Sequence, residues 1–352
     1  MNSIKNKEYF HNNLIRILDD LSIKKLSSSE INFLKKKRIL ITGVSGVIGI
    51  NLLFFFNKLS NNKKLSIHID GTYNTSLFKF VKDHFKKNEK VNFIKIDLSK
   101  KKLIERKKYD LIFHCAGYGQ PSKFLKHKDS TYKLNSSAIM NLKKNLKKNS
   151  KFVYMSTSEI YSGNNQKCTE KSIGSTGPHH ARSSYIDSKK FGESYVVNCF
   201  SDYLIFRACL IYGPGVKMSD ERVINQVMVR GIKNKTIDVF GGLKQFRSNL
   251  HISDAVNMIV KTLSKSKNQT FNLSNHKKTT LGKIFKLIGK LSKKKIVYHK
   301  SKMSGAPKVI NICNNKILKV TNYKISTKIE KGLLKTLQWY QNLISVNVVN
   351  KF

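Results

Sequence analysis

Residues 41–49 read Ile-Thr-Gly-Val-Ser-Gly-Val-Ile-Gly, which places glycines at positions 43, 46 and 49. An apolar segment at 38–42, typical of a buried strand, precedes them, and an apolar run with helical spacing follows. Glycine lets the backbone approach a phosphate closely, and a helix N-terminus offers unpaired N–H groups to it. A sharp turn without any ligand is the alternative. We predict a dinucleotide site, in which the cofactor contacts Gly43, Gly46, Val47, Ile48 and Gly49.

Short apolar segments alternate with longer amphipathic stretches through the following part of the chain. The candidate strands lie at 38–42, 65–70, 91–96, 110–114, 151–156 and 203–208. Apolar strands that alternate with helices indicate a parallel sheet covered by helices on both faces. The sequence therefore predicts an α/β fold with a doubly wound parallel (Rossmann) sheet, which binds its ligands at the carboxyl ends of the strands.

Three regions are expected along the chain. Phe10, Leu14 and Leu18 mark an amphipathic helix, so residues 1–36 are predicted to form a helical N-terminal extension. The NAD-binding Rossmann domain is assigned to 37–212, with a later contribution from about 236–275. Residues 213–352 are predicted to form mainly a smaller, mixed substrate-binding domain, with helices at 219–234, 280–293 and 328–343.

Composition narrows the classes of protein that fit. The 352 residues include no apolar run long enough to span a bilayer, so no membrane insertion and a cytoplasmic location are expected. The five cysteines form no close pairs, which argues against a disulfide framework or a zinc site, and no metal is expected. The net charge of +46 would attract polyanions, but the lysines are spread along the whole chain. We expect no specific nucleic-acid partner; a basic polyanion-binding protein retaining the fold is the alternative of another class.

Asp70 is the candidate for the ribose contact. It follows Gly49 by 21 residues (70 minus 49) and closes the expected second strand. An acidic residue about 20 residues past the glycine motif binds the adenosine ribose hydroxyls of NAD. An ordinary turn at the strand end is the competing interpretation.

Tyr185 and Lys189 are four residues apart, so a helix would present them on the same face. A tyrosine has a reference pKa of about 10, and a neighbouring ammonium group favours its phenolate form. Tyr185 is therefore a candidate general base toward an alcohol that is being oxidised. The hydroxyl side chains of 156–158 follow the expected strand at 151–156, where they can reach a bound ligand.

Taken together, these motifs resemble the extended short-chain dehydrogenases of the NAD-dependent epimerase/dehydratase family, which modify nucleotide sugars. The resemblance spans about residues 38–341 and rests on Thr-Gly-x-x-Gly-x-x-Gly at 42–49, Asp97-Leu98, His-Cys-Ala-Gly at 114–117, Ser-Thr-Ser-Glu-Ile-Tyr at 156–161, Tyr-x-x-x-Lys at 185–189, Arg-x-x-x-x-Tyr-Gly-Pro at 207–214 and Phe-Gly-Gly at 240–242. It implies NAD as cofactor, a nucleotide-sugar substrate and a homodimer.

The resemblance also implies roles for individual residues. Asp97 and Leu98 would flank the adenine, and Ala116 of the His-Cys-Ala-Gly motif would lie against the cofactor. Thr157 would bind the sugar O4, Tyr185 would act as the base, and Lys189 would hold the nicotinamide ribose. Sugar C4 would then be oxidised to a 4-keto intermediate.

Glu159 bears on the step that follows oxidation. Thr-x-Glu resembles the UDP-glucuronate decarboxylases and the sugar 4,6-dehydratases, although Ser158 stands where dTDP-glucose dehydratases carry an aspartate. Ser158, Arg182 and Arg247 would contact the substrate, and Glu159 would be catalytic. Decarboxylation or 4,6-dehydration is therefore expected, with a 4-epimerase as the alternative. Two positions depart from the family pattern: Leu210 replaces an asparagine, and no arginine lies next to Pro307.

Overall fold

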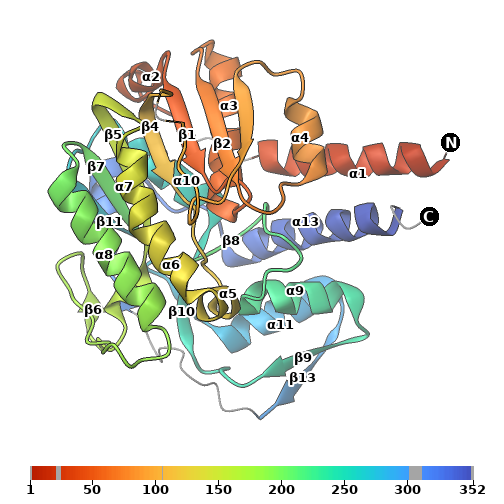
Figure 1. Ribbon diagram of the computed structural model, residues 1–352. Helices are drawn as coiled ribbons and strands as arrows, with labels where there is room; N and C mark the ends of the chain where they lie inside the picture. The colour runs from red at the N-terminus through yellow and green to blue at the C-terminus, as the bar shows by residue number, and fades with distance from the viewer. Residues whose placement is uncertain (1, 21–24, 105, 301–310, 350–352) are drawn as a thin grey trace.

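The computed structural model describes residues 2–20, 25–104, 106–300 and 311–349. Its centre is a parallel sheet of seven strands in the order β11-β7-β5-β4-β1-β2-β3 (Figure 1). The strands are β1 (Arg38–Thr42), β2 (His68–Tyr73), β3 (Val91–Lys95), β4 (Tyr109–His114), β5 (Leu146–Thr157), β7 (Tyr203–Ala208) and β11 (Gln269–Leu273). The doubly wound fold predicted from the sequence is confirmed.

Helices cover both faces of this sheet because successive strand residues point to opposite sides. Ile39 and Ile41 of β1 join one apolar core, and Leu40 between them joins the other. The first core lies under α3 (Val47–Lys63), α4 (Lys79–Phe85) and α10 (Ile252–Thr262). The second lies under α6 (Lys128–Asn135), α7 (Ser137–Lys143) and α8 (Ser183–Cys199), and the short α5 (Pro121–Lys126) packs on α6 and α8.

The second strand lies three residues later than its expected position at 65–70. Lys64 and Ser66 have positive φ angles of 50° and 52°, so the extended conformation begins only after them. β2 then continues to Tyr73, so Asp70 lies in the middle of the strand and not at its carboxyl end. This shift changes which residues reach the ligand edge of the sheet.

The remainder of the chain forms smaller sheets and a group of helices beside the carboxyl edge of the main sheet (Figure 1). The sheets are β8 (Leu210–Tyr212) with β10 (Phe246–His251) and β12 (Lys278–Thr280), β9 (Thr236–Phe240) with β13 (Lys295–His299), and β6 (Lys167–Cys168) with β14 (Asn311–Ile312). The helices are α9 (Val223–Lys233), α11 (Leu281–Ser292), α12 (Asn315–Thr321) and α13 (Ile329–Val349). The domain boundaries expected from the sequence stay a prediction.

Two helices precede β1 among the residues that the structure describes. In α1 (Asn2–Asp19) the buried Leu14 and Leu18 face the core, and this helix packs along α13. The short α2 (Ser28–Leu34) begins with a capping box, in which Ser27 and Glu30 satisfy each other's backbone N–H groups. The expected amphipathic helix is therefore present in the first 30 residues of the sequence.

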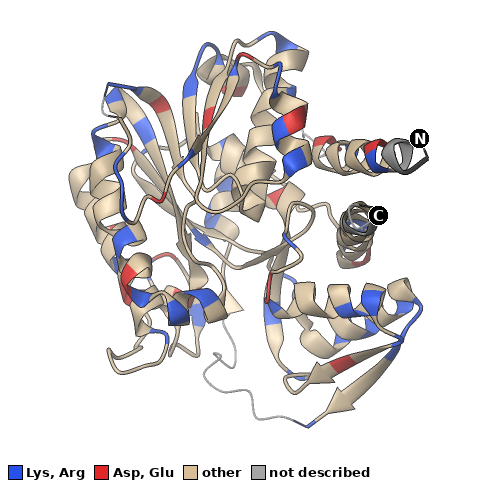
Figure 2. Ribbon diagram, turned by 45° about the vertical axis from the view of Figure 1, so that its right-hand side comes forward, with Lys and Arg blue, Asp and Glu red and all other residues tan. Residues whose placement is uncertain are grey.

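Positively charged residues occur throughout the fold. Figure 2 shows Lys and Arg on helices, loops and strand ends throughout the ribbon. Within the described residues, none of the helices has both the length and the apolar character needed to cross a bilayer.

Candidate functional site

Two adjoining cavities lie at the carboxyl ends of the central strands. The larger, of about 590 Å³, runs along the glycine turn, and the smaller, of about 420 Å³, lies beside the end of β5. Their walls share Val47, Ile48, Cys115, Gly117, Tyr118, Gly119 and Arg222. Because they share these walls, the two cavities form one continuous cleft with room for a cofactor next to a substrate.

The glycine turn is packed too tightly for any side chain at two of its positions. Gly43 has a φ of +72°, and a Cβ there would lie 2.8 Å from the Cα of Ala116. A Cβ at Gly49 would lie 2.4 Å from the carbonyl oxygen of Gly43. Thr42 fixes the turn against the end of β4, because its Oγ1 accepts hydrogen bonds from the N–H groups of Cys115 and Ala116, both at 3.1 Å.

The N-terminus of α3 opens directly into the larger cavity. Its N-cap is Gly46, which has no side chain to occupy the helix end, and the first intrahelical bond runs from the N–H of Ile50 to the oxygen of Gly46. The N–H groups of Val47, Ile48 and Gly49 therefore have no acceptor within the helix, and they lie at the end where the helix dipole is positive. Gly43, Gly46, Val47, Ile48 and Gly49 all line this cavity, so the turn fits a diphosphate.

Asp97, Leu98 and Ala116 line the same cavity, beyond the end of β3 and at the end of β4. Burial alone would raise the pKa of Asp97, but hydrogen bonds from the Oγ and N–H of Ser99, at 2.6 and 3.0 Å, lower it below its usual value. The carboxylate is thus a stable acceptor at this end of the cleft.

Asp70 does not belong to the cleft, which corrects the expectation that it binds the ribose. It lines neither cavity, and its carboxylate accepts hydrogen bonds from Tyr109 at 2.8 Å, Lys107 at 2.9 Å and Asn92 at 3.1 Å. These partners lie on β3, at the start of β4 and directly before β4. At the end of β2, the cavity is lined by Thr72, Tyr73, Asn74 and Thr75.

A loop that the sequence reasoning did not single out spans the larger cavity. Gly215, Val216, Lys217, Ser219 and Asp220 form part of its wall. The Nζ of Lys217 donates to the carbonyl oxygen and Oγ of Ser76, the residue after the lining Thr75, at 2.6 and 3.0 Å. Gln120 donates to Asp220 at 3.1 Å and accepts from the N–H of Glu221 at 3.2 Å. We call residues 213–222 the strap. The rule that ligands bind beyond the carboxyl ends of strands could have found it, because it follows β8.

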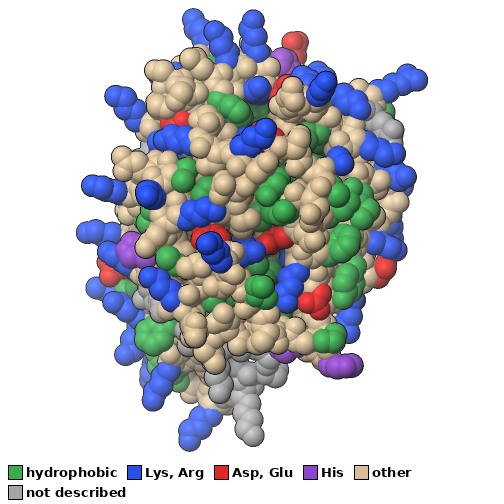
Figure 3. All heavy atoms as spheres, turned by 90° about the vertical axis from the view of Figure 1, so that its left-hand side faces the viewer, with side chains coloured by type: hydrophobic (Ala, Val, Ile, Leu, Met, Phe, Trp, Pro, Cys, Tyr) green, Lys and Arg blue, Asp and Glu red, His purple; other side chains and the backbone are tan. Residues whose placement is uncertain are grey.

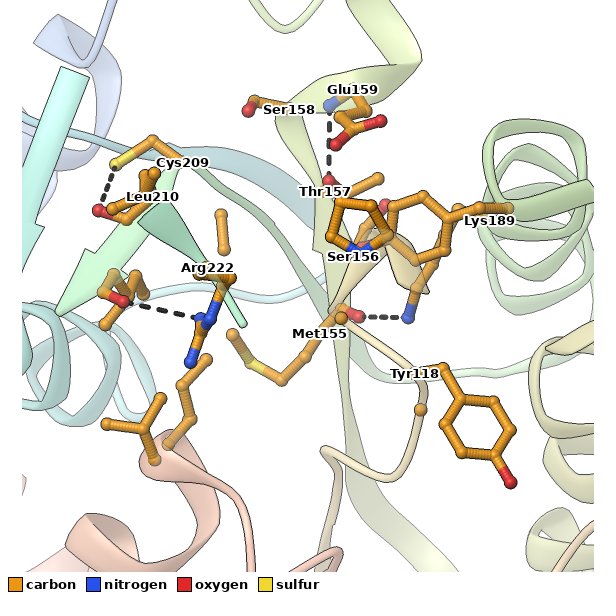
Figure 4. Close-up of a pocket in the computed structure, with 18 of the residues that line it drawn as sticks. Tyr118, Met155, Ser156, Thr157, Ser158, Glu159, Lys189, Cys209, Leu210 and Arg222 are labelled. Atoms are coloured by element: carbon orange, nitrogen blue, oxygen red, sulfur yellow. Dashed lines mark hydrogen bonds between the residues drawn. The ribbon is translucent and has the colours of Figure 1, made fainter. Parts of the chain in front are cut away.

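The smaller cavity brings together the predicted catalytic side chains. Thr157 ends β5, and Tyr185 and Lys189 line the cavity from α8. Figure 4 shows Lys189 beside the end of β5. The Nζ of Lys189 donates to the carbonyl oxygen of Met155 at 2.7 Å and lies 4.8 Å from the ring centre of Tyr154. Arg222 reaches the cavity from the opposite wall, as Figure 4 shows.

Burial dominates the titration of the catalytic pair. It raises the pKa of Tyr185 to about 12, and the charge of Glu159 adds to this effect, while a hydrogen bond from Thr157 and the cations Arg222 and Arg182 oppose it. Burial lowers the pKa of Lys189 to about 8. In the protein alone, burial outweighs these cations, so the phenol of Tyr185 keeps its proton at neutral pH. The expectation that Lys189 favours the phenolate stays a prediction.

Glu159 and Arg182 form an ion pair at the mouth of the smaller cavity. Nη1 of Arg182 lies 2.6 Å from Oε1 of Glu159, whereas Oε2 is buried and receives no hydrogen bond from the described residues. The guanidinium also lies 5.5 Å from the ring centre of Phe124, which stacks on Tyr185 with the ring centres 4.4 Å apart. Phe124 thus lies between the guanidinium of Arg182 and the ring of Tyr185. The local sequence around Phe124 does not indicate this contact.

The other predicted substrate contacts reach the same cavity. Ser158 and Arg247 line it, and burial lowers the pKa of Arg247, with Arg182 adding to that effect. Leu210, at the position where the family pattern has asparagine, contributes an apolar wall. The stretch around Pro307 lies outside the described residues. Within the described part of the chain, no three His, Cys, Asp or Glu side chains are grouped closely enough to hold a metal ion.

Comparison with known proteins places these features in a family. The chain is 25% identical over 262 residues to UDP-glucuronic acid decarboxylase 1 of Xenopus tropicalis, covering 73% of this chain and 60% of that protein. It is 28% identical over 254 residues to dTDP-D-glucose 4,6-dehydratase of Dictyostelium discoideum, covering 62% of this chain and 54% of that protein. The chain thus spans less than two thirds of the length of these two relatives.

A solved structure shares the fold. UDP-glucuronic acid 4-epimerase from Bacillus cereus, crystallised with UDP-glucuronic acid and NAD, superposes with a TM-score of 0.71 at 22% identity, covering 87% of this chain and 99% of the other. Residues 39–274, more than half of the chain, match the sequence model of the NAD dependent epimerase/dehydratase family. The chain therefore belongs to the NAD-dependent epimerase/dehydratase family, and NAD is its cofactor.

Proposed function

We propose that the protein is an NAD-dependent enzyme that oxidises C4 of a nucleotide sugar to a 4-keto intermediate and then decarboxylates or dehydrates it. The observation that carries this proposal is the meeting of Thr157, Tyr185 and Lys189 in the smaller cavity, which shares part of its wall with the larger one. A dinucleotide in the larger cavity and a sugar in the smaller one would both reach these side chains. The decarboxylase and dehydratase relatives support the same reaction class.

Tyr185 and Thr157 act on the sugar in this proposal. Thr157 orients the C4 hydroxyl, and the phenolate of Tyr185 accepts its proton. NAD supplies the hydride acceptor and a positively charged ring. A cation in this cavity favours the phenolate, which offsets the burial that raises the pKa of Tyr185 to about 12 in the protein alone. Lys189, fixed on Met155, adds donors and charge beside the tyrosine.

Glu159 and Arg182 would act on the ketone. The buried Oε2 of Glu159 has no partner among the described residues, so it suits a hydroxyl or a water that arrives with the substrate. Arg182 matches a carboxylate or a diphosphate through its forked donors, but its 2.6 Å bond to Glu159 must then be shared or exchanged. A sugar carrying a carboxylate gives Arg182 this second partner, and we therefore place decarboxylation of a UDP-uronate ahead of 4,6-dehydration.

Product analysis tests the proposal directly. The purified full chain is incubated separately with UDP-glucuronate, UDP-glucose and dTDP-glucose, and the products are separated by chromatography, which resolves epimers, and identified by mass. Loss of CO2 from UDP-glucuronate is expected; loss of water from a neutral sugar would point to dehydration. Isomerisation without any change of mass would replace both with the 4-epimerase. No turnover of any nucleotide sugar would overturn the proposal.

The strap is predicted to slow the release of NAD. Lys217→Met removes two hydrogen bonds to Ser76 across the larger cavity, worth about 1–1.5 kcal/mol together, so NAD should dissociate about tenfold faster. Stopped-flow displacement of NADH, followed by its fluorescence, measures this rate. Lys335→Met, which removes an exposed ion pair with Asp20 far from the cleft, serves as the control and should leave the rate unchanged. Equal rates in all three proteins would contradict this role for Lys217.

A homodimer is proposed through the face that carries α6, α7 and α8. Tyr132, Met140, Phe191 and Val197 expose between 38% and 45% of their surface on these helices, and Figure 3 shows apolar side chains among the lysines on this side of the molecule. Phe191→Asp places a charge in the centre of that face and should convert the dimer to a monomer in sedimentation experiments. Phe240→Asp, at a 52% exposed position on β9, is the matched control. A wild-type monomer would exclude this interface.

A further inference from the structure

Glu193 is a buried carboxylate behind the catalytic pair, and every bond it makes ties α8 to the central sheet. Its Oε1 accepts from the Oγ of Ser156 at 2.5 Å and from Nε of Arg207 at 3.1 Å. Its Oε2 accepts from Nε and Nη2 of Arg207 at 3.1 and 2.7 Å. Ser156 belongs to β5 and Arg207 to β7, so a single side chain of the helix joins two neighbouring strands.

The same helix face carries Tyr185, Lys189 and Glu193 at intervals of four residues. Lys189 donates to Met155, and Glu193 accepts from Ser156, the next residue of β5. Thr157 follows immediately. Two successive residues of β5 are thus fixed to α8 directly before the hydroxyl that faces the substrate.

Close packing keeps the helix and the strand in register. A Cβ at Gly192 would lie only 2.4 Å from the hydroxyl of Tyr154, so glycine at this position allows α8 to approach β5. The hydroxyl of Tyr154 in turn donates to Asn135 of α6 at 3.0 Å. Because Glu193 is next to Gly192, a substitution at Glu193 would disturb the close packing of α8 on β5.

Glu193 also acts on the charge of Lys189: burial lowers the pKa of this lysine, and Cys115 and then Glu193 oppose that effect. The other groups that interact with this ammonium are His114 and Cys115 at the end of β4 and Tyr154 on β5, and Tyr185 lies one helical turn before Lys189 on the same helix. Burial lowers the pKa of His114 to about 4 and raises that of Cys115 to about 12, so both are neutral near pH 7. Burial also raises the pKa of both tyrosines, and Arg207 is already paired with Glu193.

We propose that Glu193 is a positioning residue of this site, which fixes α8 beside Thr157 and keeps the ammonium group of Lys189 charged. The role of Glu193 in catalysis rests on the proposed function, but its effect on the protonation of Lys189 does not. Removing the negative charge makes the buried ammonium less favourable, and so Lys189 would lose its proton at a lower pH.

Glu193→Gln tests the charge while keeping the shape. The full chain is labelled with a trace of acetic anhydride at a series of pH values, and the acetylation of Lys189 is measured by peptide mass. The wild-type midpoint is expected near pH 8, and the variant midpoint about one unit lower. In an active preparation, the alkaline limb of the kcat profile should shift in the same direction, while KM changes little. An unmoved midpoint in the variant would overturn the proposal.

Three further variants separate positioning from general destabilisation. Asp202→Asn breaks the ion pair with Lys151, which lies on β5 six residues before Thr157 (157 minus 151), and should lower the unfolding temperature without moving the Lys189 midpoint. Glu193→Asp keeps the negative charge and should retain the wild-type midpoint of Lys189. If Glu193→Gln does not fold, Glu193→Asp still tests whether the shorter carboxylate keeps that midpoint. Ser156→Ala keeps the carboxylate but frees β5, so we expect about a tenfold lower kcat at an unchanged midpoint. A midpoint shift in Asp202→Asn equal to that in Glu193→Gln would defeat the proposal.

The two proposals can fail separately. A shifted midpoint in Glu193→Gln, with no turnover of any nucleotide sugar by the wild type, would remove the proposed reaction but leave the link between Glu193 and Lys189. Normal turnover with identical Lys189 midpoints would remove the link and leave the reaction.

Discussion

Tyr185→Phe should lower kcat by about 10³-fold and leave the affinity for NAD unchanged. The substitution removes only the hydroxyl that is proposed to accept the sugar proton. The ring itself stays in place, because it stacks on Phe124 with an interplanar angle of 5°. Single-turnover measurements with the accepted nucleotide sugar give the rate, and calorimetric titration gives the affinity for NAD.

The matched control is another buried tyrosine that loses the same atom. The hydroxyl of Tyr323 donates to Asp254 at 2.8 Å, and neither residue lines the cleft. Tyr323→Phe should lower the free energy of unfolding by about 1 kcal/mol and leave kcat as it is. Wild-type turnover in Tyr185→Phe would remove this residue from the mechanism, whatever the identity of the substrate.

Gly49→Ala should weaken NAD binding by about 10- to 100-fold. The new Cβ would lie 2.4 Å from the carbonyl oxygen of Gly43 and 2.9 Å from the Cα of Val44, so the turn or the first turn of α3 has to move. Such overpacking costs about 1–3 kcal/mol, and each 1.4 kcal/mol corresponds to a tenfold change in affinity. Titration calorimetry with NAD, together with the thermal unfolding midpoint, measures both parts of the effect.

Gly177→Ala provides the comparison at a site with free space. No heavy atom lies within 4 Å of a Cβ added there, and Gly177 lines neither cavity. This variant should bind NAD as the wild type does. If Gly49→Ala also bound NAD with unchanged affinity, the glycine stretch would be only a structural turn.

Local pattern was sufficient for most of the sheet. The segments at 38–42 and 203–208 match β1 and β7 at both ends, because each is apolar and bounded by residues that do not continue a strand. The predicted bounds of the second strand were wrong for a local reason. The positive φ angles at Lys64 and Ser66 delay the start of the strand, and hydrophobic periodicity does not indicate such backbone angles.

Asp70 shows that spacing from the glycine motif is not sufficient to identify a ribose-binding residue. Its distance from Gly49 fits a ribose contact, but its environment depends on Lys107 and Tyr109, which arrive from another part of the chain. A three-residue shift in β2 moves the carboxylate away from the ligand edge. Spacing along the chain cannot report this, because the partners of a buried charge are chosen by packing in three dimensions.

The sequence by itself determined the doubly wound sheet and the glycine turn at its carboxyl edge, and it placed Thr157, Tyr185 and Lys189 in order behind that turn. These features follow from periodicity and from residue types that only certain backbones accept. The tertiary structure alone decided the rest: the ion pair of Glu159 with Arg182, the strap held by Lys217, and the link from Glu193 to β5 and β7. Each joins segments distant in sequence, and burial, which shifts the pKa values of Tyr185 and Lys189, exists only once those segments are packed together.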